Sequence, residues 1–367
     1  MADARVEKLA QILVDHSAEI KPGDRVAIEA TTAAQPLVRA LCANILDRGG
    51  YPYPLLALPD QEEIMFAHAR DEQLEAIPPF HKLAYEQFES RIRVHSATNP
   101  RALSSVDPAK QRRRQKAMAP ILETQMRRGA NRSFKWVTTL FPTEGYAIEA
   151  EMGLSDFEDF VYHACHADQA DPVEYWNKVE SKQKKIIDRI EGHNQVVLRG
   201  PNVDLSLSIK GRKFLNASGK SNMPDGEVFT GPVEDSLNGF VHYSYPAIYS
   251  GVLVEGVELT FSNGKVTKAH AEKNQSFLME MLESDPGARY VGEFAIGTNY
   301  EIDRFSHNIL FDEKLGGSFH MALGASYPET GGKNKSIIHW DMICGMQKDS
   351  EILLDGEVIY KDGKFTF

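Results

Sequence analysis

The pattern of hydrophobic positions in the first half of the chain alternates between helical and strand-like spacing. Apolar residues between Val6 and Leu13 recur at helical intervals, and a second amphipathic helix is predicted over residues 35–47. Short, buried-strand patterns cover residues 25–29, 91–95 and 136–141. Strands that alternate with helices favour a parallel sheet with helices on its faces. We therefore expect an N-terminal α/β domain.

The second half has a different pattern, in which short strands are separated by tight turns. A capped helix is predicted from Pro172 to about Ile190, after which strand patterns appear at 204–209, 253–261 and 266–270. A further helix is predicted over residues 274–282. The strongest two-residue hairpin signals are Asn263-Gly264, Asp355-Gly356 and Asp362-Gly363.

These patterns predict two domains of different class. Residues 1–194 are expected to form the α/β domain with a mostly parallel sheet, and residues 195–367 a mainly antiparallel, β-rich α+β domain. A chain of 367 residues is also longer than one hydrophobic core usually supports.

Composition excludes some classes of function. The formal net charge of -11 argues against binding nucleic acid, which requires a basic surface. The three cysteines form no CxxC pair, so neither a disulfide framework nor a cysteine zinc site is expected. The chain has no 18-residue apolar stretch and no signal-peptide pattern at its start. We therefore expect a cytoplasmic protein that contacts neither a membrane nor nucleic acid.

Residues that commonly bind metal are concentrated between positions 225 and 341. His339 and Asp341 are two residues apart, so in a strand both side chains point to the same face. A single pair of this kind is more often a surface hydrogen bond, but His320 precedes it by about twenty residues. Glu293 lies among apolar residues and glycine, where a carboxylate needs a cation or a hydrogen-bond donor. Glu227 begins a further predicted strand, a position that is usually exposed to solvent.

Four segments of the second half resemble the M29 family of metallo-aminopeptidases, the aminopeptidase T and aminopeptidase S group. Each segment alone is a weak signal, but their occurrence in the same order is specific. The N-terminal segment PGDRVAIEA is also similar to this family. The four segments are MPDGEVFTGP (223–232), VGEFAIGTN (291–299), ILFDEKLGGSFHMALGASY (309–327) and IIHWDMI (337–343).

The resemblance implies an aminopeptidase, a hydrolase in which a water activated by two divalent ions removes the N-terminal residue of short peptides. It implies a homodimer and an active-site role for Tyr327. A bridging carboxylate would hold the two ions together, and Glu293 is the first choice for it. Zinc, cobalt, manganese and magnesium all suit ligands of mixed oxygen and nitrogen type. The implied metal ligands are Glu227, Glu293, Glu313, His320, His339 and Asp341.

Two other readings of the same residues remain open. Two histidines and one aspartate also form the facial triad of non-haem iron enzymes, and ring-cleaving dihydroxypyridine dioxygenases are similar in fold to the aminopeptidases. Glu227 and Glu293 favour the peptidase, because a single iron triad does not require them. A binding or scaffold protein that lost its activity is disfavoured by the complete set of ligand types.

Overall fold

The computed structural model describes residues 3–367, which divide into two compact units. Among the described residues, the first contains residues 3–177 and Gly219–Pro224, and the second contains Lys178–Ser218 and Asp225–Phe367. The sequence patterns predict one boundary between residues 194 and 195. The two units instead divide between Asn177 and Lys178, inside the helix over residues 172–190. A short strand near residue 222 belongs to the first unit because it pairs with that unit's sheet.

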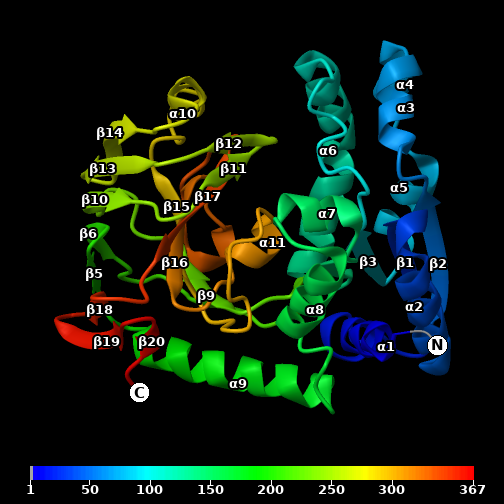
Figure 1. The fold of residues 1–367 in the computed structure, drawn as a ribbon, viewed down its shortest axis with the longest axis horizontal. Coiled ribbons are helices and arrows are strands. Elements are labelled where there is room, and N and C mark those ends of the chain that lie inside the picture. Colours follow the sequence, from blue (N-terminus) through cyan, green and yellow to red (C-terminus); the bar gives the residue numbers. More distant parts are fainter. Residues whose placement is uncertain (1–2) are drawn as a thin grey trace. The chain divides into compact units, whose positions relative to one another are not determined.

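The first unit is an α/β structure built on one parallel sheet (Figure 1). The strand order is β2-β1-β3-β4-β8, and each neighbouring pair is parallel. The strands are β1 (Arg25–Thr31), β2 (Tyr51–Ala57), β3 (Ser90–His95), β4 (Lys135–Leu140) and β8 (Asn222–Met223). The helices are α1 (Ala4–Gln11), the π-helical η1 (Ile12–Ser17), the 3-10 helix η2 (Thr32–Ala34), α2 (Gln35–Asp47), α3 (Gln61–His68), α4 (Asp71–Leu74), α5 (Pro79–Gln87), α6 (Pro108–Ala130), α7 (Glu144–Glu149) and α8 (Leu154–Ala164). The long helix α9 (Pro172–Ile190) begins in this unit, and its residues from Lys178 onward belong to the second.

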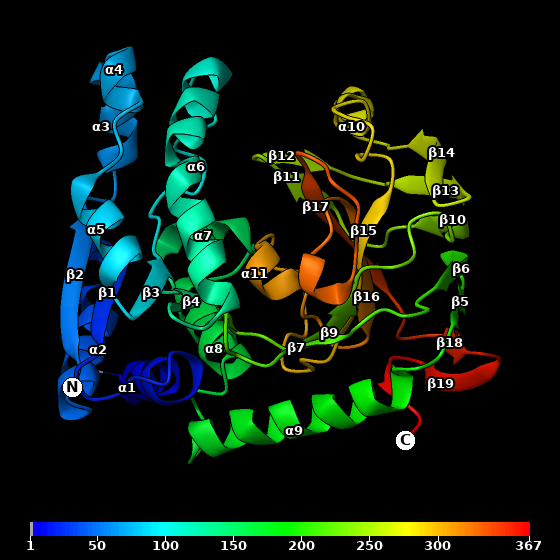
Figure 2. The same ribbon diagram turned by 180° about the vertical axis from the view of Figure 1, so that it is seen from behind.

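The second unit is mainly antiparallel and β-rich (Figure 2). Its sheets have the orders β14-β13-β10-β6-β5-β18-β19-β20, β17-β16-β15-β9-β7 and β11-β12. The strands are β5 (Gln195–Gly200), β6 (Val203–Ser208), β7 (Leu215–Ala217), β9 (Glu227–Thr230), β10 (Asn238–His242), β11 (Ala247–Tyr249), β12 (Val252–Val254), β13 (Glu258–Ser262), β14 (Lys265–His270), β15 (Val291–Gly297), β16 (Ser318–Gly324), β17 (His339–Gly345), β18 (Glu351–Leu354), β19 (Glu357–Lys361) and β20 (Lys364–Phe365). The short helices are α10 (Gln275–Leu282), α11 (Ile309–Asp312) and the 3-10 helix η3 (Pro328–Thr330).

The fold class predicted from the sequence is confirmed, and so are the three hairpin turns. Asn263, Asp355 and Asp362 all have positive φ, and a glycine with positive φ follows each. Two consecutive residues with positive φ are what the tight hairpin turn requires. One strand prediction is wrong: residues 253–261 form β12 and β13 rather than one strand. The chain turns between them at Gly256, which has a φ of +62°.

The core of the second unit explains why its five-stranded sheet can carry polar residues on one face. Large apolar side chains of β15, β16 and β17, including Phe294, Phe319 and Trp340, are buried in one cluster with residues of the eight-stranded sheet. Because side chains alternate along a strand, the intervening residues of β15, β16 and β17 point to the opposite face. That face is therefore not required for the apolar core.

A buried histidine of the first unit predicts sensitivity to acid. His166 is 3% exposed and stacks on Tyr175 with ring centroids 3.8 Å apart. Burial lowers the pKa of His166 to about 4. The folded protein therefore keeps this ring neutral, while the unfolded chain binds a proton below about pH 6.5. As the pH falls from 6.5 towards 4, unfolding becomes more favourable by up to about 3 kcal/mol.

Urea unfolding at pH 7.0 and pH 4.5 measures this effect. We expect His166→Gln to lose less stability between the two pH values than the unchanged protein. His68→Gln, at an exposed position, is the matched control. An equal loss of stability in the His166→Gln variant and the unchanged protein would contradict the assignment.

None of the helices within residues 3–367 is both long and apolar enough to cross a membrane.

Candidate metal centre

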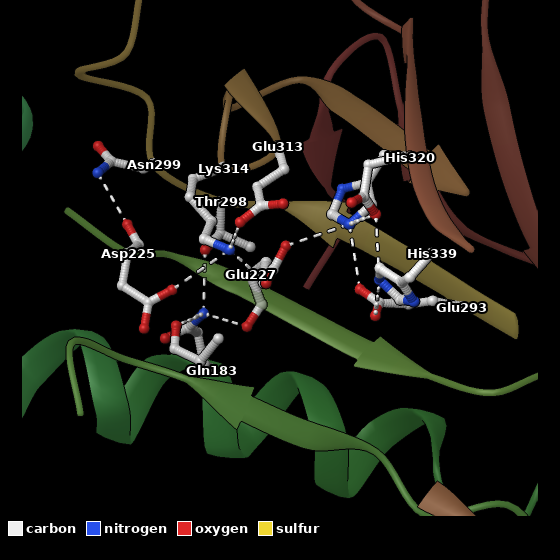
Figure 3. A network of polar contacts seen from close by, with 12 residues as sticks. Gln183, Asp225, Glu227, Glu293, Thr298, Asn299, Glu313, Lys314, His320 and His339 are labelled. Carbon is white, nitrogen blue, oxygen red and sulfur yellow. Dashed lines mark hydrogen bonds and ion pairs between the residues drawn. The ribbon is translucent and has the colours of Figure 1, made fainter. Parts of the chain in front are cut away.

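Acidic and imidazole side chains from four strands meet on the polar face of the five-stranded sheet. Glu227 begins β9, Glu293 lies in β15, His320 in β16, and His339 and Asp341 begin β17. The strand register places all five on the same face, because direct cross-strand partners point the same way. Figure 3 shows Glu227, Glu293, His320 and His339 converging from these strands.

The residues between these side chains on the same face are small. Glu293 is opposite Ala322, which is in turn opposite Asp341. The other cross-strand partners of the five residues are Ala217, Ala295, Gly297, Gly324 and, opposite His320 at the far end of the face, the larger Ile343. Alanine and glycine leave space above the sheet that larger side chains would fill. The sequence therefore provides both the polar groups and the room between them.

His320 lies at the centre of the cluster and is completely buried. Its Nε2 atom lies 3.2 Å from Glu293 Oε1, 3.4 Å from Glu227 Oε2 and 3.9 Å from Asp341 Oδ1. Three carboxylates around one ring nitrogen are repelled by one another unless a positive charge lies among them. This arrangement requires a cation or a proton.

His339 is held with one nitrogen facing the same carboxylates. Its Nδ1 atom donates a hydrogen bond of 2.9 Å to the carbonyl oxygen of Ala325, so Nδ1 carries a proton. The opposite nitrogen, Nε2, lies 3.5 Å from Glu293 Oε2 and 3.6 Å from Asp341 Oδ1. A backbone carbonyl that fixes one nitrogen and directs the other inward is typical of metal-binding histidines.

The pKa values of the cluster follow from burial and mutual attraction. Burial tends to lower the pKa of His320, but Glu227 and Glu293 outweigh it and raise the pKa to about 10. Burial raises the pKa of Glu227 to about 8, despite the neighbouring charges of Lys314 and His320. Burial also tends to raise the pKa of Glu293, but its hydrogen bond and charge interaction with His320 lower it overall. The imidazole of His320 thus balances part of the negative charge of Glu227 and Glu293.

Three buried atoms of the cluster make no hydrogen bond among residues 3–367. These atoms are Glu227 Oε2, His320 Nδ1 and Asp341 Oδ1. Buried polar atoms are nearly always paired, so two carboxylate oxygens without donors are an unusual feature. Carboxylate oxygens and imidazole nitrogens are suitable ligands for divalent cations. The donor set therefore fits a metal centre.

Two overlapping groups within the described residues have ligand atoms that all lie within 4.8 Å of one another. The first is Glu227, Glu293 and His320, and the second is Glu313, His320 and Asp341. The structure thus brings Glu313, which directly follows α11, to the other five predicted ligands. His339 lies outside both groups but faces two of their members at the distances given above.

Tyr327 lies beside this cluster, immediately before η3. Its ring packs edge-on against His339 and Phe229, with centroids 5.4 Å and 5.5 Å apart. The residue is 37% exposed, so it reaches both the cluster and solvent. Burial, together with the charges of Glu293 and Asp341, raises the pKa of Tyr327 above its usual range. The phenol therefore keeps its proton and can donate a hydrogen bond at neutral pH.

The sequence analysis did not identify two residues that support the carboxylates. Lys314 donates to both Glu227 and Glu313, and Gln183 of α9 donates to the backbone carbonyl of Glu227. Glu313-Lys314 in the sequence resembles an ordinary exposed pair of charges. The uncharged Leu315, Gly316 and Gly317 that follow Lys314 are visible in the sequence, but the burial of Lys314 is evident only from the fold.

Comparisons with known proteins agree over nearly the whole chain. Aminopeptidase 2 of Geobacillus stearothermophilus is 27% identical over 403 residues, covering 99% of this chain and 95% of that protein. Aminopeptidase AmpS of Bacillus subtilis (strain 168) is 26% identical, with coverage of 99% and 98%. The structure of wild-type AmpT from Thermus thermophilus has a TM-score of 0.86 at 23% identity, covering 99% of both chains.

A second solved structure shares the fold more distantly. The 2,5-dihydroxypyridine dioxygenase from Pseudomonas putida KT2440 has a TM-score of 0.55 at 15% identity, covering 99% of this chain and 96% of that one. The family model described as thermophilic metalloprotease (M29) matches residues 2–365. The resemblance seen in the sequence is thereby confirmed, and the chain belongs to the M29 family of metalloproteases.

Proposed function

We propose that this protein is an aminopeptidase that removes the N-terminal residue from short peptides and uses two divalent metal ions. The observation that carries the proposal is the convergence of carboxylates and imidazoles on one sheet face, above alanine and glycine. The aminopeptidase names of the relatives support the same activity. The proposed ligands are Glu227, Glu293, Glu313, His320, His339 and Asp341.

Glu293 is the residue best placed to serve both ions. Its Oε1 atom faces His320 and its Oε2 atom faces His339, at 3.2 Å and 3.5 Å. One ion would be held by Glu227, Glu293 and His320, and the other by Glu293, His339 and Asp341. Glu313 would complete the set through the oxygen that faces His320 and Asp341. Zinc, cobalt, manganese and magnesium remain the candidates for this donor set.

The residues around the ions suit peptide hydrolysis. When bound, divalent ions polarise the peptide carbonyl and lower the pKa of a water molecule, so that hydroxide forms near neutral pH. Tyr327 would donate a hydrogen bond to the carbonyl oxygen as negative charge develops on it, which stabilises the transition state more than the substrate. The Ala325 carbonyl keeps His339 oriented during the reaction.

The dioxygenase reading uses only His320, His339 and Asp341. It leaves the buried carboxylates of Glu227 and Glu293, 5% and 4% exposed, without a role. Lys314 compensates part of the charge of Glu227, but Glu293 faces the two imidazoles, so a buried acid beyond the triad favours more than one divalent cation. This feature favours hydrolysis over oxygen chemistry.

The proposal includes a homodimer in the cytoplasm. The edge strand β2 exposes Tyr51, Tyr53 and Leu56, each by more than two fifths, which provides apolar surface for a second copy. Cys42, Cys165 and Cys344 are all free thiols, as a reducing compartment favours. A sedimentation mass of one chain would exclude the dimer, and recovery in a secreted fraction would exclude the location.

Chelation followed by addition of single metals tests the proposed function. The stripped protein should lose nearly all hydrolysis of aminoacyl-nitroanilides and regain it with zinc, cobalt, manganese or magnesium. Oxygen consumption with iron(II) and a dihydroxypyridine should remain at background. Full hydrolysis by protein shown to be metal-free, or iron-dependent oxygen uptake without hydrolysis, would overturn the proposal.

A further inference from the structure

Lys314 is a completely buried lysine that faces three carboxylates at the metal centre. Its side chain is 1% exposed, and Nζ lies 2.6 Å from Glu227 Oε1, 2.5 Å from Glu313 Oε1 and 3.8 Å from Asp225 Oδ1. Figure 3 shows the ammonium among these acids, on the side of Glu227 away from His320. Lysine is almost never fully buried unless it is paired.

The surroundings of Lys314 keep it positively charged. Its Nζ atom lies within hydrogen-bond distance of one oxygen each of Glu227 and Glu313, and two adjacent carboxylates favour the charged ammonium over the neutral amine. A lysine that keeps its proton cannot serve as a general base. Its function at this position is therefore that of a fixed cation.

Lys314 donates a hydrogen bond to only one of the two carboxylate oxygens of each neighbouring glutamate. Glu227 Oε1 accepts its hydrogen bond from Lys314, while Oε2 points to His320 and makes no hydrogen bond. Glu313 likewise gives Oε1 to Lys314. Each carboxylate is thus left with one oxygen that can face a metal ion.

The backbone around this lysine is also held in place. Gln183 Nε2 donates to the carbonyl oxygens of Glu227 and Ala217, at 2.7 Å and 3.1 Å. Asn299 Nδ2 donates to the carbonyl oxygen of Asp225 at 2.9 Å. The backbone of Glu227 is therefore fixed by the amide of Gln183, and its carboxylate by the ammonium of Lys314.

We propose that Lys314 is a positioning residue, a built-in cation that restricts Glu227 and Glu313 to binding metal through one oxygen each and holds them in place before metal arrives. The proposal rests on the metal-dependent function above. It adds that this site contains a permanent ammonium besides its exchangeable ions. The ammonium balances part of the carboxylate charge when no metal is bound.

Thermal unfolding of Lys314→Met, with and without metal, tests the proposal. Methionine approximates the length of lysine but removes the charge, so Glu227 and Glu313 lose their cation. In the chelated protein, we expect the midpoint to fall by on the order of 10 °C, because breaking a buried ion pair is strongly destabilising. With zinc or cobalt bound, the fall should be less than half as large, because the ions supply the missing charge.

Lys273→Met is the matched control, because it removes an exposed lysine that lies 2.6 Å from Glu255 in the same unit. It should change neither midpoint appreciably. An equal fall of the Lys314→Met midpoint with and without metal would overturn the proposal, since a purely structural lysine predicts that result. Failure of the unchanged protein to bind metal would instead reject the proposed function.

A second variant covers the case in which Lys314→Met does not fold. Lys314→Met combined with Glu313→Gln removes one charge of each sign and preserves the balance. Loaded with cobalt(II), it should show a visible absorption spectrum different from that of the Glu313→Gln single variant, because both Glu227 oxygens become available to the metal. Identical cobalt spectra for the single and the double variant would show that the lysine does not control how the carboxylate of Glu227 binds.

Discussion

Replacing Glu293 with Gln is expected to lower kcat/KM by at least about 10³-fold and to remove one metal ion per chain. The two oxygens of Glu293 face the two imidazoles, so this residue is the link between both halves of the centre. Glutamine has nearly the same shape but replaces one oxygen with an NH₂ group, which cannot bind a cation. Elemental analysis of the purified variant and hydrolysis of an aminoacyl-nitroanilide measure the two effects.

Glu258→Gln is the matched control for this experiment. Glu258 lies in β13 of the other sheet and pairs with the exposed His242 at 3.4 Å. Its replacement should leave metal content and activity unchanged. If Glu293→Gln retained both ions and full activity, Glu293 could not bridge them.

Replacing Tyr327 with Phe should reduce kcat by roughly 10²- to 10³-fold while metal content stays the same. The ring would still pack against His339 and Phe229, so only the hydroxyl is lost. Because the proposed hydrogen bond strengthens in the transition state, KM should change little compared with kcat.

Steady-state kinetics at fixed metal concentration separate the two parameters for Tyr327→Phe. Tyr300→Phe is the control, because the Tyr300 hydroxyl donates to the carbonyl oxygen of Gly363 rather than facing the cluster. A normal kcat for Tyr327→Phe would remove the tyrosine from the mechanism. A large rise in KM alone would assign it to substrate binding.

Local patterns in the sequence predict the elements of this fold better than their pairing. The Asn-Gly and Asp-Gly turns, the helix over residues 35–47 and the shared face of His339 and Asp341 all depend on short-range geometry, and all are observed. Strand β2 was not predicted, because Pro52 and Pro54 argue against a strand. Proline is tolerated there because β2 is at the edge of its sheet.

The candidate site depends on long-range pairing that the pattern does not contain. Nothing in the residues themselves indicates that β9 pairs with β15, which brings Glu227 to Glu293 across more than sixty positions. The resemblance to the M29 family implied that both residues bind metal, but not which strands pair. Lys314 shows the opposite case, because its burial follows only from the packing of the chain around α11. An acid followed by a lysine normally indicates a solvated surface.

Anomalous X-ray diffraction from crystals loaded with zinc or cobalt locates the ions and therefore tests whether these side chains form a two-metal centre. We expect one peak in contact with Glu227, Glu293 and His320, and a second in contact with Glu293, His339 and Asp341. Ions bound only at other residues, or no ions in an active enzyme, would contradict it.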